Sequence, residues 1–452
     1  MISLVEIAIG GFYMKYQNNW ESLNSRPVPQ WFADAKFGIF IHWGLYSVPS
    51  FAPKGQYAEW YWNALKCPNP NENQLAFREF HKKTYGENFD YTDFVGMFKA
   101  ECFDADEWAE LFERSGAKYI NLVSKHHDGF CMYKSEYAPW WNSVDVGPHR
   151  DFCMELKNAL QKTSVRFGVY HSVYEWYHPL YLKDPEEYSL KHLIPMLKEL
   201  IEKYQPATLF TDGEWEHDSS VWHSTEFLQW LYNESSVKDY IVPNDRWGSE
   251  TRGKLGGNFT TEYGYISCES SPGGILAMDS YERPNEECRG IGGSFGWNRF
   301  ETPDDYLSSK ELIHMLIDLV SRGSNFLLNI GPTADGRIPV IMQQKLIDIG
   351  DWLKVNGEGI YSTVKYKNST DSNIRYTKKG DTLYAFILKF PYGQITLNEI
   401  DYDPSYTAEL LGSDTEPTVT NDNGKLSLAF PSINPDTLAC SHAYCVKLNK
   451  KQ

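Results

Sequence analysis

The segment DADEWAELFERSGAKYINLVSKHH, residues 104–127, contains the structural unit that decides the fold. Asp104 stands where a helix N-cap is expected, Glu107 follows three residues later, and the amphipathic run stops at Gly116. The apolar run YINLV then predicts a short buried strand that ends at His126. The segment therefore predicts one helix followed by one strand, with polar residues where the strand ends.

The same unit of a helix followed by a strand recurs along the chain. The recurrences are residues 151–172, 189–215 and 224–247. An earlier apolar strand lies in AKFGIFIHWG, and a later helix leads through Gly323 into NFLLNIGP. Helices that alternate with short apolar strands indicate a parallel sheet, and this many in about 350 residues predict a (β/α)8-type, TIM-like barrel.

In such a barrel the functional side chains gather at the carboxyl ends of the strands. The polar residues at the predicted strand ends are His42, His126 with His127, Tyr170, Asp212 and Arg246. After about residue 360 the sequence changes to short β-rich runs such as TLYAFILKF and AYCVKL, which predict a C-terminal β-sandwich. We therefore divide the chain into an N-terminal arm (1–20), a (β/α)8-like catalytic domain (21–360) and a β-sandwich domain (361–452).

Composition excludes some classes of partner. The chain has 452 residues and a formal charge of −17 without clustered Lys and Arg, so we expect neither nucleic acid nor an anionic membrane as a partner. The apolar start MISLVEIAIGGFYM lacks a basic leader and contains Glu6, so it is a poor signal peptide. The compartment stays open between the cytoplasm and a processed secreted, periplasmic or lysosomal form. A homo-oligomer is compatible with the sequence.

The cysteines do not indicate a metal site. The eight cysteines include no CxxC pair, which disfavours zinc and a dense disulfide framework, although Cys440 and Cys445 are close enough in sequence to form a bridge. Sequons at Asn233, Asn258 and Asn368 matter only if the chain is secreted. The load of 15 Trp and 30 Tyr suits the apolar faces of sugar rings as well as a protein core.

Asp212 in FTDGEWE is a candidate nucleophile, because a carboxylate at a strand end of a barrel is well placed for attack. The competing interpretation is a turn residue before Gly213. A glycosidase also needs a second carboxyl, about 5 to 5.5 Å away if configuration is retained. The residues that qualify by type are Glu262, Glu269, Glu286 and Glu287, and composition does not choose among them.

His126 and His127 have three possible roles. A metal site needs three or four ligands, and adjacent strand residues tend to face opposite ways, so the pair is a weak metal signature. A structural hydrogen-bonding role and substrate binding are the alternatives, since an imidazole donates to or accepts from neutral sugar hydroxyls. We expect no metal and no cofactor.

A family resemblance is carried by long motifs that occur in order between about residues 20 and 365. The motifs are AKFGIFIHWGLYSVP, YAEWYWN, SKHHDGF, TDGEW, VPNDRWG, SFGWNR and NFLLNIGPTADG. They resemble the α-L-fucosidases of glycoside hydrolase family twenty-nine. The resemblance implies a retaining exo-glycosidase that removes terminal α-L-fucose from oligosaccharides or glycoconjugates through a covalent fucosyl-enzyme. It also implies the fold read above.

The resemblance assigns roles residue by residue. Asp212 matches the nucleophile, and Glu262 in TTEYG resembles the acid/base, with Glu286 as the second choice. The residues that match positions holding the fucose hydroxyls, ring and methyl group are His42, Glu59, His126, His127, Tyr170, Arg246 and Trp297. Asp128 is expected to orient its loop. One departure is Phe210, where many members have Trp, because Phe keeps an apolar wall but loses the indole N–H donor.

Two other functions remain open on the sequence. A metal-dependent hydrolase would use His126 and His127 as ligands. A non-catalytic fucose-binding protein would keep the aromatic pocket after losing one carboxyl. For Arg246 the alternative is a structural ion pair, and for Trp60, Trp62 and Trp297 it is core packing.

Overall fold

A parallel sheet forms the larger part of the computed structural model, which describes residues 15–251, 266–269, 284–367, 371 and 373–451. Its strands are β1 (Phe37–Ile41), β2 (Tyr119–Lys125), β3 (Val169–Ser172), β4 (Thr208–Asp212), β5 (Val242–Pro243), β6 (Ile266–Glu269), β7 (Asn285–Gly290) and β8 (Ser324–Ile330). They form one eight-stranded sheet in the order β5-β4-β3-β2-β1-β8-β7-β6. Every neighbouring pair is parallel and β8 lies beside β1, which is the strand order of a (β/α)8-type barrel.

The helices of this domain alternate with the strands. They are α1 (Trp20–Asn24), α2 (Gln30–Ala35), α3 (Tyr61–Lys66), α4 (Glu72–Tyr85), α5 (Ala105–Arg114), α6 (Phe152–Leu160), α7 (Pro179–Lys183), α8 (Pro185–Tyr188), α9 (Ile194–Tyr204), α10 (Ser224–Asn233), α12 (Ser309–Ser321) and α13 (Val340–Asn356). Within the described residues, no helix has the length and apolar character that a membrane span requires. The predicted fold class is confirmed.

The unit that opened the sequence analysis folds as predicted. The Asp104 carboxylate accepts hydrogen bonds from the backbone N–H groups of Asp106 and Glu107, at 2.9 and 3.1 Å, and so caps α5. Gly116 has a φ of +84°, a conformation that suits glycine, and the chain then enters β2. The strand ends at Lys125, one residue before the predicted end, so both histidines lie beyond it.

Two strands carry no apolar signal and were not predicted. β6 and β7 have the sequences ISCE and NEECRG, and β7 buries Asn285, Glu286 and Glu287. β5 has only two residues, so Arg246 follows it at a distance of three positions.

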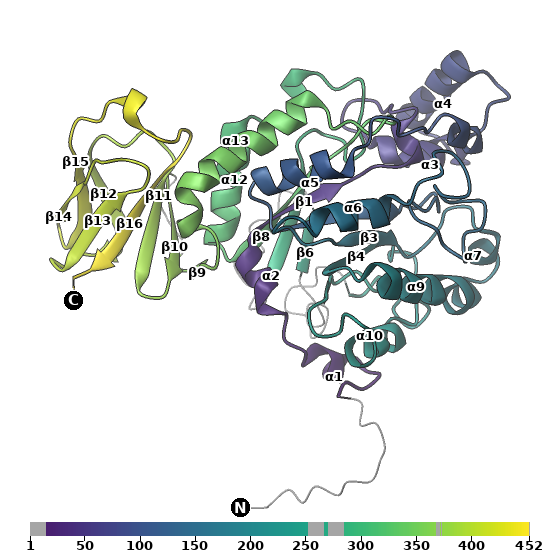
Figure 1. Ribbon diagram of the computed structural model, residues 1–452, viewed down its shortest axis with the longest axis horizontal. Coiled ribbons are helices and arrows are strands. Elements are labelled where there is room, and N and C mark those ends of the chain that lie inside the picture. The colour runs from purple at the N-terminus through teal and green to yellow at the C-terminus, as the bar shows by residue number, and fades with distance from the viewer. Residues whose placement is uncertain (1–14, 252–265, 270–283, 368–370, 372, 452) are drawn as a thin grey trace, which may run out of the picture.

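The C-terminal strands form two antiparallel sheets, which Figure 1 shows at the opposite end of the molecule from α4 and α7. The strands are β9 (Val364–Lys365), β10 (Ile374–Lys379), β11 (Thr382–Ile387), β12 (Gly393–Asp401), β13 (Tyr406–Leu410), β14 (Thr418–Asp422), β15 (Lys425–Phe430) and β16 (Tyr444–Lys450). Side chains of both sheets, including Ile387 and Leu428, share one core, as in a β-sandwich. The domain contacts the helices of the barrel, since the Trp352 indole of α13 donates to Ala443 O at 2.8 Å.

The described cysteines are free thiols, and these include Cys440 and Cys445. The bridge considered between them is therefore not formed. Cys445 is a buried residue of β16. The Cys440 thiol donates to the Ala443 carbonyl at 3.7 Å. Asn258 and Asn368 lie outside the described residues, and so does most of the proposed N-terminal arm.

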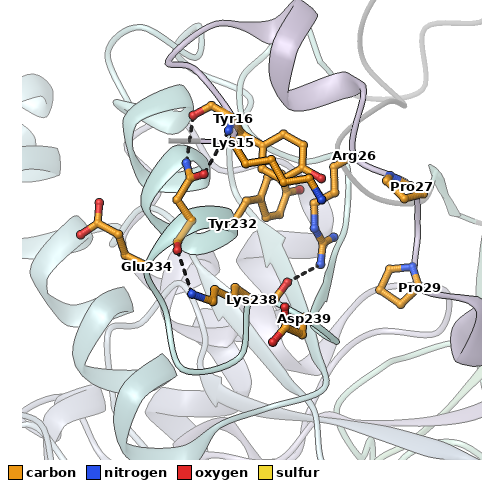
Figure 2. Close-up of a pocket in the computed structure, with 10 residues that line it drawn as sticks. Lys15, Tyr16, Arg26, Pro27, Pro29, Tyr232, Glu234, Lys238 and Asp239 are labelled. Carbon is orange, nitrogen blue, oxygen red and sulfur yellow. Dashed lines mark hydrogen bonds between the residues drawn. The ribbon is translucent and has the colours of Figure 1, made fainter. Parts of the chain in front are cut away.

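A cavity of about 620 Å³ lies where the start of the described chain meets α10. In Figure 2, Tyr16, Arg26 and Tyr232 lie against one another, and the Arg26 guanidinium is 4.3 Å from the Tyr232 ring centroid. The Asn233 amide accepts from Tyr16 N at 3.0 Å and donates to Tyr16 O at 2.9 Å and to Gln229 O at 2.8 Å. Both amide hydrogens of Asn233 are therefore used in hydrogen bonds, and this side chain joins α10 to the backbone of Tyr16.

Candidate active site

Asp212 is the last residue of β4 and is 8% exposed at the carboxyl end of the barrel. The Arg246 guanidinium donates to Oδ1 at 2.5 Å, and the Tyr170 hydroxyl donates to Oδ2 at 3.1 Å. Nε2 of His127 lies 3.6 Å from Oδ2. These neighbours stabilise an ionised carboxylate, because one is cationic and another is a hydrogen-bond donor.

Phe210 forms the floor beneath this carboxylate. The guanidinium carbon of Arg246 lies 4.8 Å from the Phe210 ring centroid, and the Tyr170 ring stacks on Phe210 at 5.9 Å. Phe40 of β1 packs against the same ring at 4.9 Å. The aromatic layer fixes Arg246 and Tyr170 from below, and burial raises the pKa of the Tyr170 phenol well above its ordinary value, with Asp212 adding to the shift. Tyr170 is therefore a neutral donor.

His126 and His127 lie at the same end of the barrel, with their ring centroids 5.7 and 6.4 Å from that of Tyr170. Their ring centroids lie 4.2 Å apart, because both residues follow the end of β2 and the alternation of a strand no longer applies to them. The Ser172 hydroxyl donates to Tyr174 O at 2.6 Å, so its oxygen accepts Nδ1–H of His127 at 2.6 Å. Burial, with His127 and His42 nearby, lowers the pKa of His126 well below its ordinary value, so the imidazole is neutral.

His42 follows β1 and is held by the neighbouring strand. Its Nδ1 lies 2.7 Å from the amide oxygen of Asn329, which can only accept, so Nδ1 carries the proton. The Asn329 amide nitrogen donates in turn to Phe295 O at 2.7 Å. The His42 ring packs on Phe295 at 5.0 Å and on Tyr170 at 5.6 Å, which brings β1, β3 and the segment after β7 together.

Glu59 and the segment that carries Trp297 are joined to each other and to the end of β8. The buried Glu59 carboxylate accepts from Gly296 N at 2.8 Å and from the Ser294 hydroxyl at 3.4 Å. It thereby ties η2 (Ala58–Trp60) to the segment that carries Trp297, which is half-buried. The Trp297 backbone lies against Gly331 at the carboxyl end of β8, where an added Cβ would come within 2.5 Å of Trp297 N.

Asp128 holds the turn that follows His127. Its Oδ2 accepts from the Tyr91 hydroxyl at 2.7 Å, and its Oδ1 accepts from Phe130 N at 3.1 Å. Burial raises the pKa of Asp128 to about 6. These contacts match the loop-orienting role expected for this residue.

The acid/base candidates are separated by the structure. Glu262, the first choice, lies outside the described residues, as does the side chain of Glu269. Glu286 is the second residue of β7 and accepts from the hydroxyl of Tyr119, the first residue of β2. Glu286 thus lies at the amino end of the barrel, and it does not face Asp212 at the carboxyl end. Glu287 points to the other face of β7 and pairs with Arg289 at 2.5 Å.

Aromatic residues that the sequence reasoning missed pack against the histidines. Phe295 touches His42, and Trp176 lies 5.4 Å from His127. Trp215, which is 37% exposed, stacks on Trp60 at 5.9 Å and lies 5.4 Å from His127. All of these lie in loops beyond strand ends, so the only signal in the sequence was the excess of aromatic residues near the motifs.

One group of the described side chains has the spacing of a metal site. Ligand atoms of Glu175, His178 and His192 lie within 4.8 Å of one another. The group includes neither His126 nor His127. A metal at the histidine pair therefore gains no support from the described residues.

At the carboxyl end of the barrel, a buried carboxylate lies among imidazole, phenol and aromatic side chains. This arrangement is typical of glycoside hydrolases. Two family models match the chain, alpha-L-fucosidase over residues 6–358 and the alpha-L-fucosidase C-terminal domain over residues 366–449. The chain belongs to the α-L-fucosidase family, and it is a glycoside hydrolase with α-L-fucosidase activity. The family resemblance drawn from the motifs is confirmed.

Relatives match over nearly the full length. An alpha-L-fucosidase of Dictyostelium discoideum is 41% identical over 93% of this chain and 90% of its own. Tissue alpha-L-fucosidase of Homo sapiens is 39% identical over 96% of this chain and 92% of its own. The Thermotoga maritima alpha-fucosidase in complex with fucose has a TM-score of 0.79 and 32% identity, covering 96% of this chain and 100% of that one.

Proposed function

We propose that this enzyme removes terminal α-L-fucose by double displacement with retained configuration, and that Asp212 is the nucleophile. Asp212 attacks the anomeric carbon while Glu262 protonates the departing oxygen, which gives a covalent fucosyl-enzyme. Glu262 then takes a proton from water, which hydrolyses the intermediate. The observation that carries the assignment is the Asp212 carboxylate at the carboxyl end of β4, bonded to Arg246 and Tyr170.

The electrostatics support a nucleophile rather than an acid at Asp212. Arg246 is always protonated and contacts Oδ1, which favours the ionised carboxylate despite burial. Tyr170 donates to the other oxygen and fixes the plane of the carboxylate. A general acid would need the opposite environment, one that raises its pKa toward neutrality.

The sugar-binding set is part of the same proposal. It comprises His42, Glu59, His126, His127, Tyr170, Arg246 and Trp297. A neutral His126 suits neutral hydroxyls, since each imidazole offers one donor and one acceptor. Phe210 and Phe295 supply apolar surface next to these polar groups, which fits the methyl group of fucose.

The proposed substrates are fucosylated oligosaccharides or glycoconjugates. Solved relatives support this, since one Thermotoga maritima structure contains fucose and another, an alpha-L-fucosynthase, contains alpha-L-Fuc-(1-2)-beta-L-Fuc-N3. A formal charge of −17 disfavours nucleic acid and an anionic membrane as partners. Assembly into a homo-oligomer remains a proposal for sedimentation or light scattering to test.

The decisive experiment replaces Asp212 by glycine. We expect the Asp212→Gly variant to keep its fold and to lose turnover of an aryl α-L-fucoside by about 10⁴-fold or more. Azide should restore turnover and give a fucosyl azide of the opposite anomeric configuration, because a small anion attacks in place of the carboxylate. Near wild-type turnover in the variant would overturn the assignment.

A further inference from the structure

A buried ion pair lies directly behind the histidine turn. Nζ of Lys125 lies 2.8 Å from Oε1 of Glu175, and the two side chains are 0% and 8% exposed. The same oxygen accepts from Nε2 of His192 at 2.8 Å and from the Tyr188 hydroxyl at 3.2 Å. Burial would raise the pKa of Glu175, but Lys125 and His192 hold it below its ordinary value, so the carboxylate is ionised.

Each residue of this pair directly precedes, in the sequence, a residue of the candidate active site. Lys125 is the last residue of β2 and precedes His126. Glu175 precedes Trp176, whose backbone N–H donates to His127 O at 2.9 Å and whose ring lies 6.0 Å from His126. The pair therefore joins the segment that carries the imidazoles to the loop that packs against them.

The glycine of the turn shows how closely Glu175 fits. Gly129 has a φ of +78°, and a Cβ added there would lie 2.6 Å from Oε2 of Glu175. The turn SKHHDGF thus folds directly over the carboxylate. A displaced carboxylate would move Gly129 and, with it, both histidines.

The ammonium group argues against a metal at this place. Glu175, His178 and His192 have metal-ligand spacing, but Lys125 already donates to Oε1 of Glu175. His178 Nδ1 accepts from Leu180 N at 3.2 Å and caps α7. A divalent cation would have to enter beside a buried positive charge, which low dielectric makes costly.

We infer that Lys125 and Glu175 are positioning residues for the reaction: the pair fixes the turn that presents His126 and His127 to the hydroxyls of fucose. The inference rests on the proposed sugar-binding role of the two histidines. A displacement of about 1 Å at groups that orient a substrate lowers rates by up to about 10²-fold. The pair should therefore control discrimination between hydroxyl patterns as well as stability.

The test uses the neutral double variant Lys125→Met/Glu175→Gln. Breaking a buried pair on one side leaves an uncompensated charge, whereas replacing both charges by neutral groups of similar shape avoids that penalty. The amide oxygen introduced by Glu175→Gln can still accept from His192 and Tyr188. The exposed pair Lys162 and Asp106, 2.7 Å apart, supplies the matched control Lys162→Met/Asp106→Asn.

The measured quantity is the ratio of kcat/KM for an aryl α-L-fucoside to kcat/KM for each of its monodeoxy analogues. We expect this ratio to fall by about tenfold or more for at least one analogue in the double variant, because misplaced imidazoles no longer recognise the missing hydroxyl. The control variant should keep the wild-type ratios. Uniform slowing of all substrates would show a merely structural role and would overturn the inference.

Further arms keep the result decisive. If the double variant fails to fold, Glu175→Asp retains the charge but withdraws the carboxylate, and unchanged ratios in that variant would overturn the inference. If His126→Ala itself leaves the ratios unchanged, the proposed role of the histidine fails. If the kcat/KM ratios fall in His126→Ala but not in the double variant, the positioning role of Lys125 and Glu175 is rejected, while the proposed role of His126 stands. A stoichiometric metal in the wild type that is lost in Glu175→Gln would also overturn it.

Discussion

Two buried acidic residues lie at opposite ends of the same barrel, and their surroundings differ. Asp212 ends β4 and contacts Arg246 and Tyr170, beside the histidines and an aromatic floor. Glu286 is the second residue of β7 and accepts from Tyr119, whose ring packs on Phe32 at the other end. In the proposed function, the catalytic role of Asp212 depends on the strand end at which it lies and on its neighbours, since the residue type is nearly the same in the two cases.

The largest expected difference compares Asp212→Asn with Glu286→Gln. The first change removes the nucleophilic charge with little change of shape, so kcat should fall by about 10⁴-fold or more. The second keeps an acceptor for Tyr119 at the far end, so kcat should change by less than about tenfold while stability falls by about 1 kcal/mol. Steady-state kinetics and denaturant unfolding of both variants check this. Equal losses of activity would break the comparison.

A second prediction concerns Glu262. A general acid matters most for a poor leaving group, so Glu262→Ala should lower kcat/KM by about 10²-fold or more on natural fucosides and far less on activated aryl fucosides. Loss of the base in the second step should also let the fucosyl-enzyme accumulate, which appears as a burst on activated substrates.

Glu286→Ala supplies the control for Glu262. From its position at the amino end of the barrel we expect no dependence on the leaving group. If Glu286→Ala shows that dependence and Glu262→Ala does not, the acid/base role belongs to Glu286 and the comparison of the two ends fails.

The sequence predicted the regular part of this barrel because apolar strands and capped helices leave local signals. β1 to β4 and β8 are apolar runs, and they bring His42, His126, Tyr170 and Asp212 to one rim. Tyr170 is the second residue of β3, which ends at Ser172, two residues beyond the predicted end. β7 left no such signal, because its buried residues are polar and are satisfied by partners elsewhere in the chain, such as Tyr119 for Glu286. A strand of this kind is recognised only from its tertiary contacts.

The candidate site likewise contains residues that a local pattern predicts and residues that no local pattern predicts. Residues that end strands were predicted, whereas Phe295 and Trp176 were missed because a loop aromatic has no periodicity. The orientation of His126 and His127 was also missed, since it depends on the end of β2 at Lys125. Long-range pairing, such as that of Lys125 with Glu175, fifty positions later, lies beyond any local pattern.

A third prediction uses Asp128, a buried carboxyl near Asp212 that lacks the Arg246 contact. Burial raises its pKa from 3.8 to about 6 in the folded state. Its stabilising contribution is therefore fully present below the unfolded pKa and is lost as pH rises through 6. Asp128→Asn removes this titration, so the stability difference between variant and wild type should change by about 2 kcal/mol between pH 4 and 7, in favour of the variant at pH 7. Urea unfolding at several pH values measures it, and a difference that does not vary with pH would contradict it.

The smallest expected effect is that of metal removal. Prolonged dialysis against EDTA should leave kcat and KM on an aryl α-L-fucoside unchanged, because an ionised and a protonated carboxyl supply nucleophile, acid and base without a Lewis acid. The histidines at the carboxyl end are expected to bind sugar hydroxyls, and in the group formed by Glu175, His178 and His192 the ammonium of Lys125 donates to Oε1 of Glu175. Metal analysis before and after dialysis verifies removal. Activity that disappears with EDTA and returns with zinc would assign the histidines a metal, and the carboxyl end would then owe its chemistry to that ion rather than to Asp212.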